Sequence, residues 1–456
     1  MKFYGRTEEI AALQKHLDLV KETAASRMVV VYGRRRVGKT TLVNEAFRNV
    51  DVTYLYFFVA GSGKEELMAR WKAKIVEVFG LKRESNISSL ADFIAWVMEL
   101  SEHRPVVLVF DECQELEKHE PGFYSALQNI WDQNKNTSQT LLILSGSVLS
   151  AIKKIFGDHS EPLFGRPDDF QRISAFPVSV IREIAQDFNP ELSGMDLLLT
   201  YAATGGVARY LELLAPTTQF RYDDILNFIF GRMGGTYRDE ADIYLNNEFR
   251  AESHIYQIIL WAIAQGRTKR SEIQDVVKNT NVSPYLQRLE IFGLIKRIEP
   301  FGSRTETKHR FEINDLFLKF WRLFVMGNFD DINQNQGVRV VRRITPLLPE
   351  YLGHVLEQWF RQELLESGRW DAVGAWWDRK GEHEIDLIAV DEIDKRILFG
   401  EAKLDPKKYN EIKLRMKAEA FLQVNPQYRS WSMFFRGFSP EDMLKETPSI
   451  EERASQ

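Results

Sequence analysis

Apolar residues in the first 150 positions alternate between short continuous runs and stretches of helical spacing. The continuous runs are rich in β-branched and aromatic residues and predict buried strands at 29–31, 52–58, 106–110 and 140–144. Apolar residues that recur every three or four positions predict helices at 10–20, 42–47, 67–79 and 94–98. Strands that alternate with helices are typical of an α/β domain with a mainly parallel sheet.

The pattern becomes helical after residue 186. Helical spacing predicts helices at 195–214, 225–229, 255–263, 270–277 and 283–291. Two short strand-like runs, 294–298 and 310–313, surround a polar turn at Gly302-Ser303 and predict a hairpin. Three helices followed by a hairpin form the winged-helix pattern, in which the third helix commonly enters the DNA major groove. The residues predicted to face DNA are Tyr285, Gln287 and Arg288 on the third helix, the flanking Lys269, Arg270 and Lys278, and Arg304 and Lys308 on the wing. An aromatic-rich helix at 317–325, predicted to be interdomain core, and a polar stretch at 327–336 follow.

The last part of the chain predicts one helix and two strands. The helix spans 351–365, and the strand-like runs 384–390 and 397–403 are joined by an acidic turn. The composition of 327–336, rich in Asn and Asp, indicates a linker before this part.

A glycine-rich loop lies between the first predicted strand and its helix. Residues 33–40 read Gly-Arg-Arg-Arg-Val-Gly-Lys-Thr, the spacing of a phosphate-binding P-loop in its strand–loop–helix context. Gly33 and Gly38 allow the backbone to approach a phosphate, and the loop amides and helix N-terminus point positive charge at the anion. Lys39 is expected to reach the β- and γ-phosphates of ATP, and Thr40 to ligate Mg²⁺. The predicted nucleotide-binding residues are Gly33, Arg34, Arg35, Arg36, Val37, Gly38, Lys39, Thr40 and Thr41.

Two later strands supply further candidates for this site. The apolar run 106–110 ends in Asp111-Glu112, at the strand end where open α/β sheets bind ligands. Asp111 is the candidate Mg²⁺ residue and Glu112 the candidate general base. The strand 140–144 runs into Ser145-Gly146-Ser147, where one serine, for which we select Ser147, would sense the γ-phosphate. Arg166 is a candidate for stabilising charge during phosphoryl transfer, in cis or in trans.

Acidic residues and a lysine also converge on the two C-terminal strands. Glu401 and Lys403 are two positions apart and therefore share one face of a strand. Asp386 on the neighbouring strand can join Glu401 to hold a divalent cation, and Lys403 can orient water or stabilise phosphate charge. Glu357 on the preceding helix is a further acidic candidate. A surface hairpin with alternating charges remains the alternative explanation.

Composition and charge limit the function further. The 456 residues have a net charge of −5, so the whole protein is not a polyanion binder, yet residues 251–325 carry 12 Lys and Arg against 8 Asp and Glu. That excess fits a nucleic-acid face. The single cysteine, Cys113, excludes an intrachain disulfide, and no apolar run approaches the length of a membrane span. We predict a cytoplasmic protein without membrane association.

These motifs together resemble one family. Residues 32–40, 109–112, 144–147 and 163–166 look like the archaeal-type P-loop ATPases of the AAA+/STAND branch, which also occur in bacteria. The resemblance implies a sensor-like role for Arg209, although Ala208 stands where the family often has proline. The set Glu357, Asp386, Glu401-Ala402-Lys403 resembles the PD-(D/E)xK nuclease superfamily and the C-terminal domain that typically follows these ATPases. The proline that usually precedes the aspartate is absent here.

The expected fold is α/β: a P-loop NTPase domain with a parallel sheet, a helical lid, a winged helix and a restriction-endonuclease-like domain. The predicted boundaries are 1–185 for the ATPase core, 186–248 for the lid, 249–325 for the winged helix, 326–340 for a linker and 341–456 for the nuclease-like domain. The expected cofactors are ATP and Mg²⁺, with a second divalent cation in the C-terminal domain, and DNA is the expected partner.

Two functions fit these expectations. In the first, ATP hydrolysis drives a switch coupled to DNA binding and to the nuclease-like domain. In the second, a slow ATPase serves as a signalling or scaffold protein whose winged helix and nuclease-like domain contact proteins without cleavage. The sequence leaves cleavage, the DNA substrate, a protein partner and the oligomeric state open.

Overall fold

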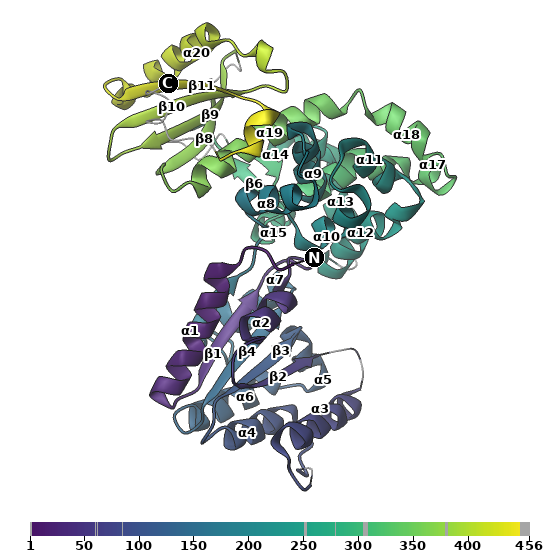
Figure 1. The fold of residues 1–456 in the computed structure, drawn as a ribbon, viewed down its shortest axis with the longest axis vertical. Helices are drawn as coiled ribbons and strands as arrows, with labels where there is room; N and C mark the ends of the chain where they lie inside the picture. The colour runs from purple at the N-terminus through teal and green to yellow at the C-terminus, as the bar shows by residue number, and fades with distance from the viewer. Residues whose placement is uncertain are drawn as a thin grey trace. The chain divides into compact units, whose positions relative to one another are not determined.

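The computed structural model describes residues 2–59, 61, 63–83, 85–249, 253–278, 280–303, 309–378 and 382–446. The chain forms two compact units (Figure 1). The N-terminal unit comprises residues 5–174, and the C-terminal unit comprises residues 175–456 together with the first four residues. No helix among the described residues is long and apolar enough to cross a membrane.

The N-terminal unit is built on a five-stranded sheet. Its strands are β1 (Arg27–Tyr32), β2 (Thr53–Phe58), β3 (Val106–Asp111), β4 (Thr140–Gly146) and β5 (Asp169–Arg172). They are all parallel and lie in the order β2-β3-β4-β1-β5. The four predicted strands and the parallel sheet are therefore confirmed, and β5 is a strand that the hydrophobic pattern missed.

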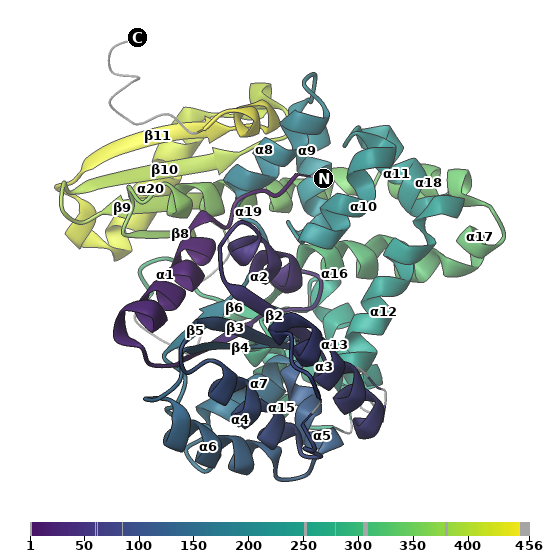
Figure 2. The same cartoon turned by 60° about the horizontal axis from the view of Figure 1, so that its bottom comes forward.

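Helices cover both faces of this sheet, as Figure 2 shows. The helices are α1 (Thr7–Thr23), α2 (Lys39–Phe47), α3 (Lys64–Phe79), α4 (Leu90–Leu100), α5 (Leu116–His119), α6 (Phe123–Asn134) and α7 (Leu149–Gly157), with a 3-10 turn η1 (Cys113–Glu115). Helices α1 and α2 pack on one face, whereas α3, α4, α6 and α7 share a hydrophobic core with the other. Central strands β3 and β4 are buried along their whole length, which explains their unbroken apolar runs.

The first part of the C-terminal unit is helical. It contains α8 (Val178–Phe188), α9 (Gly194–Thr204), α10 (Ala208–Thr218), α11 (Tyr222–Phe230), η2 (Arg232–Gly234), α12 (Gly235–Phe249), α13 (Ser253–Ala264), α14 (Arg270–Val277) and α15 (Ser283–Ile291). The single helix expected at 195–214 is in fact two, because Gly205 and Gly206 both take positive φ angles between α9 and α10.

The expected hairpin and aromatic helix follow. Strands β6 (Ile295–Ile298) and β7 (Arg310–Ile313) pair antiparallel, as predicted. The aromatic segment forms α16 (Leu316–Phe320) and a π-helical turn η5 (Trp321–Val325). The Phe317 ring stacks on Tyr210 at 3.9 Å between ring centroids, so this segment is core.

The segment expected to be a linker is helical. It contains η6 (Met326–Asn328) and α17 (Phe329–Asn333), and the following α18 (Gly337–Ile344) packs on α11. Ile332 is 5% exposed, so an apolar side chain anchors this part of the chain.

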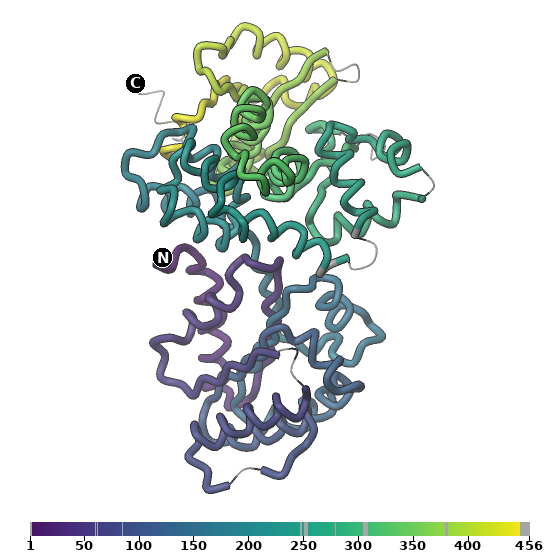
Figure 3. Tube along the Cα trace, turned by 90° about the vertical axis from the view of Figure 1, so that its right-hand side faces the viewer, coloured from purple at the N-terminus to yellow at the C-terminus, as the bar shows by residue number. Residues whose placement is uncertain are grey.

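A four-stranded mixed sheet ends the chain. Its strands β8 (Ala372–Trp377), β9 (Glu384–Asp391), β10 (Arg396–Ala402) and β11 (Ser432–Phe438) lie in the order β11-β10-β9-β8. Pairing is antiparallel except between β10 and β11. Helix α19 (Leu348–Glu366) packs on β8, β9 and β10, and α20 (Glu411–Val424) builds a core with the sheet (Figures 1 and 3). Three 3-10 turns complete it: η7 (Pro406–Lys408), η8 (Pro426–Tyr428) and η9 (Pro440–Leu444).

Buried polar contacts join the sheet to the helical part. Arg182 on α8 forms an ion pair with Glu363 on α19, and its Nε donates to the Met443 carbonyl at 2.6 Å. Glu366 on α19 accepts from the Val178 amide at the start of α8, at 3.0 Å. Helix α8, helix α19 and the 3-10 turn η9 thus belong to one packed unit.

Candidate functional site

The glycine-rich loop connects β1 to α2 in the N-terminal unit. A Cβ atom on Gly33 would lie 2.1 Å from the Ile173 carbonyl oxygen, so only glycine fits there. Gly38 takes a φ of +96° just before α2 begins. Val37 is buried, whereas the side chains of Arg35 and Arg36 are exposed. The loop is therefore anchored at both ends and at Val37, with two guanidinium groups on its outer side.

Lys39 is the first residue of α2 and is only 6% exposed. Its Nζ donates to the carbonyl oxygens of Gly33 at 3.0 Å and Arg34 at 3.2 Å. A buried ammonium group needs such acceptors. These bonds hold the ammonium inside the loop, where a phosphate oxygen is the stronger acceptor.

Asp111 lies at the carboxyl end of β3 and accepts four hydrogen bonds. Its Oδ2 accepts from Thr40 Oγ1 and Tyr56 Oη, each at 2.6 Å. Its Oδ1 accepts from Ser145 Oγ at 2.8 Å and from the Glu112 amide at 3.1 Å. The structure thus brings together Thr40 and Asp111, the two residues that the sequence assigns to Mg²⁺.

The strand register explains this convergence. Asp111 pairs with Phe58 on β2 and with Ser145 on β4, so the polar residues meet at one edge of the sheet. Tyr56 was missed because it lies within an apolar strand two positions from the end. Burial, together with its hydrogen bond to Asp111, raises the pKa of the Tyr56 phenol, which therefore stays a neutral donor.

Glu112 directly follows β3 and has a φ of +58°, an uncommon value for a residue with a side chain. Its carboxylate accepts from Ser147 Oγ at 2.7 and 2.9 Å and from Gln114 Nε2 at 2.5 Å. The predicted base and the predicted sensor serine therefore touch each other. Gln114 is a further contact that the sequence did not indicate.

The two candidate arginines have other partners. Arg166 forms an ion pair with Asp132 at 2.9 Å and donates to the carbonyl oxygens of Pro162 and Phe164. Its polar contacts among the described residues lie there rather than at the loop. Arg209 belongs to the C-terminal unit, where it follows Ala208 as the second residue of α10 and pairs with Glu212 at 2.8 Å. The roles assigned to both arginines stay predictions.

A second carboxylate cluster forms on the four-stranded sheet. Lys403 Nζ lies 3.3 Å from Glu401 and 3.8 Å from Asp386. The Asp386 carboxylate also accepts from the Ala402 amide at 2.9 Å. The pairing of β8 with β9 shifts register beside Asp386, an irregularity that can redirect a side chain.

Positive charges balance these carboxylates. Lys417 on α20 binds Glu401 at 2.9 Å, and Arg361 on α19 lies 3.7 Å from Glu357. Burial, with the charge of Glu357, raises the pKa of Asp386 to about 6. Burial of Glu401 acts in the same direction, but Lys417 and Lys403 outweigh it and lower the pKa of that carboxyl. Among the described residues, no group of three His, Cys, Asp or Glu is placed to hold a metal ion.

The predicted DNA-facing residues lie on α14, α15 and the β6–β7 hairpin. Gln287 and Arg288 on α15 are exposed, and the Tyr285 ring packs edge-on against Tyr256. The wing residues Arg304 and Lys308 lie outside the described residues.

Comparison with known proteins supports the ATPase assignment. Residues 3–214 match the family described as "ATPase domain predominantly from Archaea", and residues 321–414 match one described as "Archaea bacterial proteins of unknown function". The chain is 28% identical to Uncharacterized protein MJECL04 of Methanocaldococcus jannaschii over 421 residues, 90% of this chain and 89% of that protein. The first region is therefore similar to an archaeal ATPase domain.

A solved structure supports the same fold. The Walker-type ATPase of Pyrococcus abyssi aligns with a TM-score of 0.54 at 18% identity, and the alignment covers 70% of this chain and 96% of that one. At this identity the likeness shows the fold alone. This fold agrees with the match of residues 3–214 to the ATPase family.

Proposed function

We propose that this protein binds ATP with Mg²⁺ at residues 33–41 and hydrolyses it. The observation that carries the proposal is the 2.6 Å hydrogen bond between Thr40 Oγ1 and Asp111, beside the loop that holds Lys39. Thr40 would ligate Mg²⁺ directly, Asp111 would hold it through its water shell, and Lys39 would turn to the β- and γ-phosphates.

Glu112 is the proposed general base. It would orient and deprotonate the water that attacks the γ-phosphate. Its present bonds to Ser147 and Gln114 fix the carboxylate, and Ser147 would exchange its bond with Glu112 for one with the γ-phosphate. Arg166 would stabilise the transferring phosphate after leaving its exposed partner Asp132, and Arg209 keeps the sensor-like role that the family resemblance implies.

The test of this proposal is Glu112→Gln. The variant keeps the size and the acceptor oxygen of the side chain, so we expect ATP affinity to persist while phosphate release falls by about 100-fold or more. Glu115→Gln is the matched control, because Glu115 lies one turn later and pairs with Lys118. Equal hydrolysis by Glu112→Gln and wild type would remove Glu112 from this role.

We further propose that the nucleotide state controls a DNA-directed C-terminal unit. The order α13, α14, α15, β6, β7 fits a winged helix, and α15 exposes Gln287 and Arg288 for a groove. The sheet β8–β11 would be the nuclease-like domain, with Asp386 and Glu401 for a second divalent cation and Lys403 beside the phosphate.

A scaffold function is the second candidate. The ion pair between Lys417 and Glu401 favours it, because an ammonium group already neutralises the carboxylate that a cation would need. In that case the winged helix and the sheet would bind proteins without cleaving DNA.

A cleavage assay separates the two candidates. DNA is incubated with Mg²⁺ or Mn²⁺, with and without ATP, and with one of three proteins: wild type, Glu401→Ala or the surface control Glu411→Ala. Cleavage by wild type and Glu411→Ala but not by Glu401→Ala supports the nuclease. No cleavage, together with ATP hydrolysis that DNA does not stimulate, supports the scaffold.

A further inference from the structure

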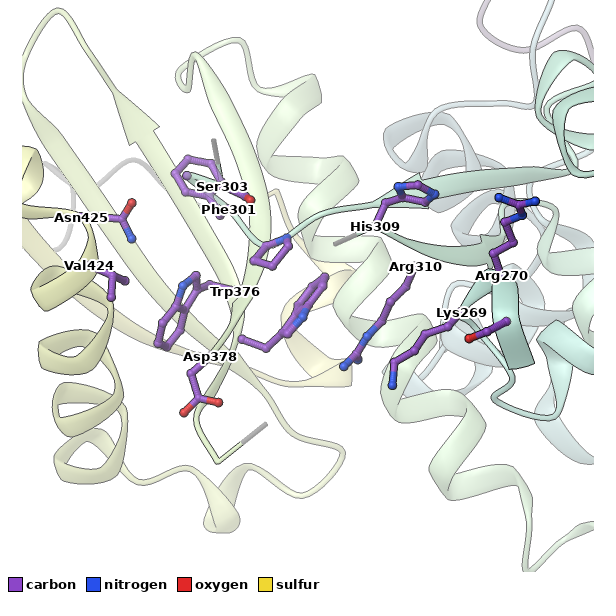
Figure 4. A pocket seen from close by; sticks show the side chains of 14 residues that line it. Lys269, Arg270, Phe301, Ser303, His309, Arg310, Trp376, Asp378, Val424 and Asn425 are labelled. Carbon is purple, nitrogen blue, oxygen red and sulfur yellow. The ribbon is translucent and has the colours of Figure 1, made fainter. Parts of the chain in front are cut away.

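A pocket of about 700 Å³ lies where the β6–β7 hairpin meets the edge strand β8, within the C-terminal unit (Figure 4). This volume is typical of a small-molecule site. The lining combines aromatic and basic side chains: Lys269, Arg270, Phe301, His309, Arg310, Trp376 and Trp377. Neither the ATPase site nor the carboxylate cluster uses these residues.

The hairpin side of the pocket is docked on the sheet. The Phe301 amide donates to the Ala375 carbonyl oxygen at 2.8 Å, which extends the edge of β8. The Phe301 ring packs into the sheet's hydrophobic core, with its centroid 6.4 Å from that of Phe421. Gly302 has a φ of +76°, and a Cβ there would lie 2.5 Å from Asn425 Oδ1. The pocket walls are therefore preformed.

The two tryptophans have different roles. Trp376 is only 4% exposed and meets Phe421 edge-on at 5.6 Å, so it belongs to the core. Trp377 is half-buried, and the Arg310 guanidinium carbon lies 5.0 Å from the centre of its ring. The guanidinium thus covers one face of the Trp377 ring, and a base stacked on the opposite face would lie close to this positive charge, an arrangement that suits a base next to a phosphate.

Positive charge dominates the mouth of the pocket. Lys269 and Arg310 point toward the same space, whereas Arg270 points away from it (Figure 4). Lys269 pairs with Glu272 at 3.4 Å on the surface, and a surface ion pair of this kind contributes little stability. Among the described lining residues, Asp378 is the one carboxylate, and it accepts hydrogen bonds from the amides of Glu382 and His383.

We propose that this pocket binds one nucleotide unit, with its base stacked on Trp377 and its phosphate held by Lys269 and Arg310. The occupant is either an unpaired nucleotide within a DNA strand or a free nucleotide, because both carry an aromatic base and a phosphate. The first source rests on the proposed DNA-directed function. A paired base cannot enter, since its face is covered within the duplex.

The test measures fluorescence anisotropy of a labelled duplex with a short single-stranded gap against the same duplex fully paired, at one salt concentration. We expect wild type to prefer the gapped DNA by about fivefold or more. Trp377→Ala should lose this preference, and Trp377→Phe should keep most of it. Arg342→Ala, which removes an exposed charge on α18, is the matched control and should leave the ratio unchanged.

Free thymidine monophosphate distinguishes the two sources, because it lacks the β- and γ-phosphates that a P-loop binds. Saturable binding that Trp377→Ala abolishes supports the pocket with a free nucleotide. Preference for gapped DNA without such binding supports a nucleotide within a strand. If wild type binds the monophosphate but no DNA, the DNA-directed function fails and the pocket stands. If wild type neither prefers gapped DNA nor binds the monophosphate, or if Trp377→Ala behaves as wild type, the proposal is wrong.

Discussion

The strand ends at Asp111 and Glu401 contain the same residue types, but different groups donate to their carboxylates. Each has a carboxylate at the end of a buried strand and a lysine nearby. At Asp111, neutral hydroxyl groups of Thr40, Tyr56 and Ser145 satisfy the carboxylate. At Glu401, the ammonium groups of Lys403 and Lys417 do so.

The difference between hydroxyl and ammonium donors bears on how readily each site would bind a charged ligand. Hydroxyl donors leave the negative charge of Asp111 in place, so a cation still gains from binding beside it. Lys39 donates to the neutral carbonyl oxygens of Gly33 and Arg34. At Glu401 the opposite charges already face each other. We therefore expect the first site to accept Mg²⁺ and phosphate more readily than the second, where ion pairs already surround Glu401.

Removing the lysine of the first site should have the largest effect. Lys39→Ala is expected to weaken ATP binding by roughly 100-fold or more, because the charge-assisted bonds to two phosphates are lost. Titration calorimetry with ATP and Mg²⁺ measures this. Lys64→Ala is the matched control, since Lys64 follows a similar Gly-Ser-Gly sequence but pairs with Glu120 at 2.7 Å. Equal losses in both variants would contradict the assignment of the loop.

Removing one lysine at Glu401 should leave its carboxylate less neutralised, and therefore closer in charge to Asp111. Lys417→Met leaves Glu401 with one ammonium partner, and we expect Mn²⁺ binding to the C-terminal unit to tighten by about tenfold. Electron paramagnetic resonance of free Mn²⁺ measures the gain, which Glu401→Gln in the same chain should cancel. Lys413→Met, at an exposed position of α20, should have no effect. No gain in Lys417→Met would identify the cluster as a structural ion-pair network.

The raised pKa of Asp386 predicts a pH-dependent stability difference. The protonated form is favoured in the fold, so the contribution of this group is present below its unfolded pKa of about 3.9 and is lost as pH rises through about 6. Asp386→Asn imitates the neutral form. Its stability relative to wild type should therefore rise between those values by about 2 kcal/mol, measured by urea denaturation. A difference that is equal at both ends of this range would refute the raised pKa.

The smallest effect is expected from a single hydroxyl group at the first site. Tyr56→Phe removes one of four donors to Asp111, so the Mg²⁺ concentration for half-maximal ATP hydrolysis should change by about threefold. Tyr54→Phe is the control, because that hydroxyl donates to Asn44 instead. An identical Mg²⁺ dependence in Tyr56→Phe and wild type would show that this bond does not position Asp111.

The hydrophobic pattern predicted the elements whose burial is complete. Strands β3 and β4 have no exposed residue and were read directly from their apolar runs. Strand β5 was missed because three of its four residues are polar and it lies at the edge of the sheet. The division of 195–214 into α9 and α10 depends on the close approach of Gly206 to the Phe176 carbonyl, a contact made by a distant segment. The five-part domain division stays a prediction.

The sequence by itself determined the phosphate loop, because a strand, a loop of fixed glycine spacing and a helix are local features. It also placed Asp111, Glu112 and Glu401 at strand ends, since these residues follow apolar runs directly. Only the tertiary structure decided what surrounds each carboxylate. Tyr56 contacts Asp111 from the neighbouring strand β2, and Lys417 contacts Glu401 from helix α20. These contacts depend on strand order and helix packing, which no local pattern encodes. The partners that set the charge of each site are long-range contacts, and for that reason the two strand ends look alike in sequence and differ in the fold.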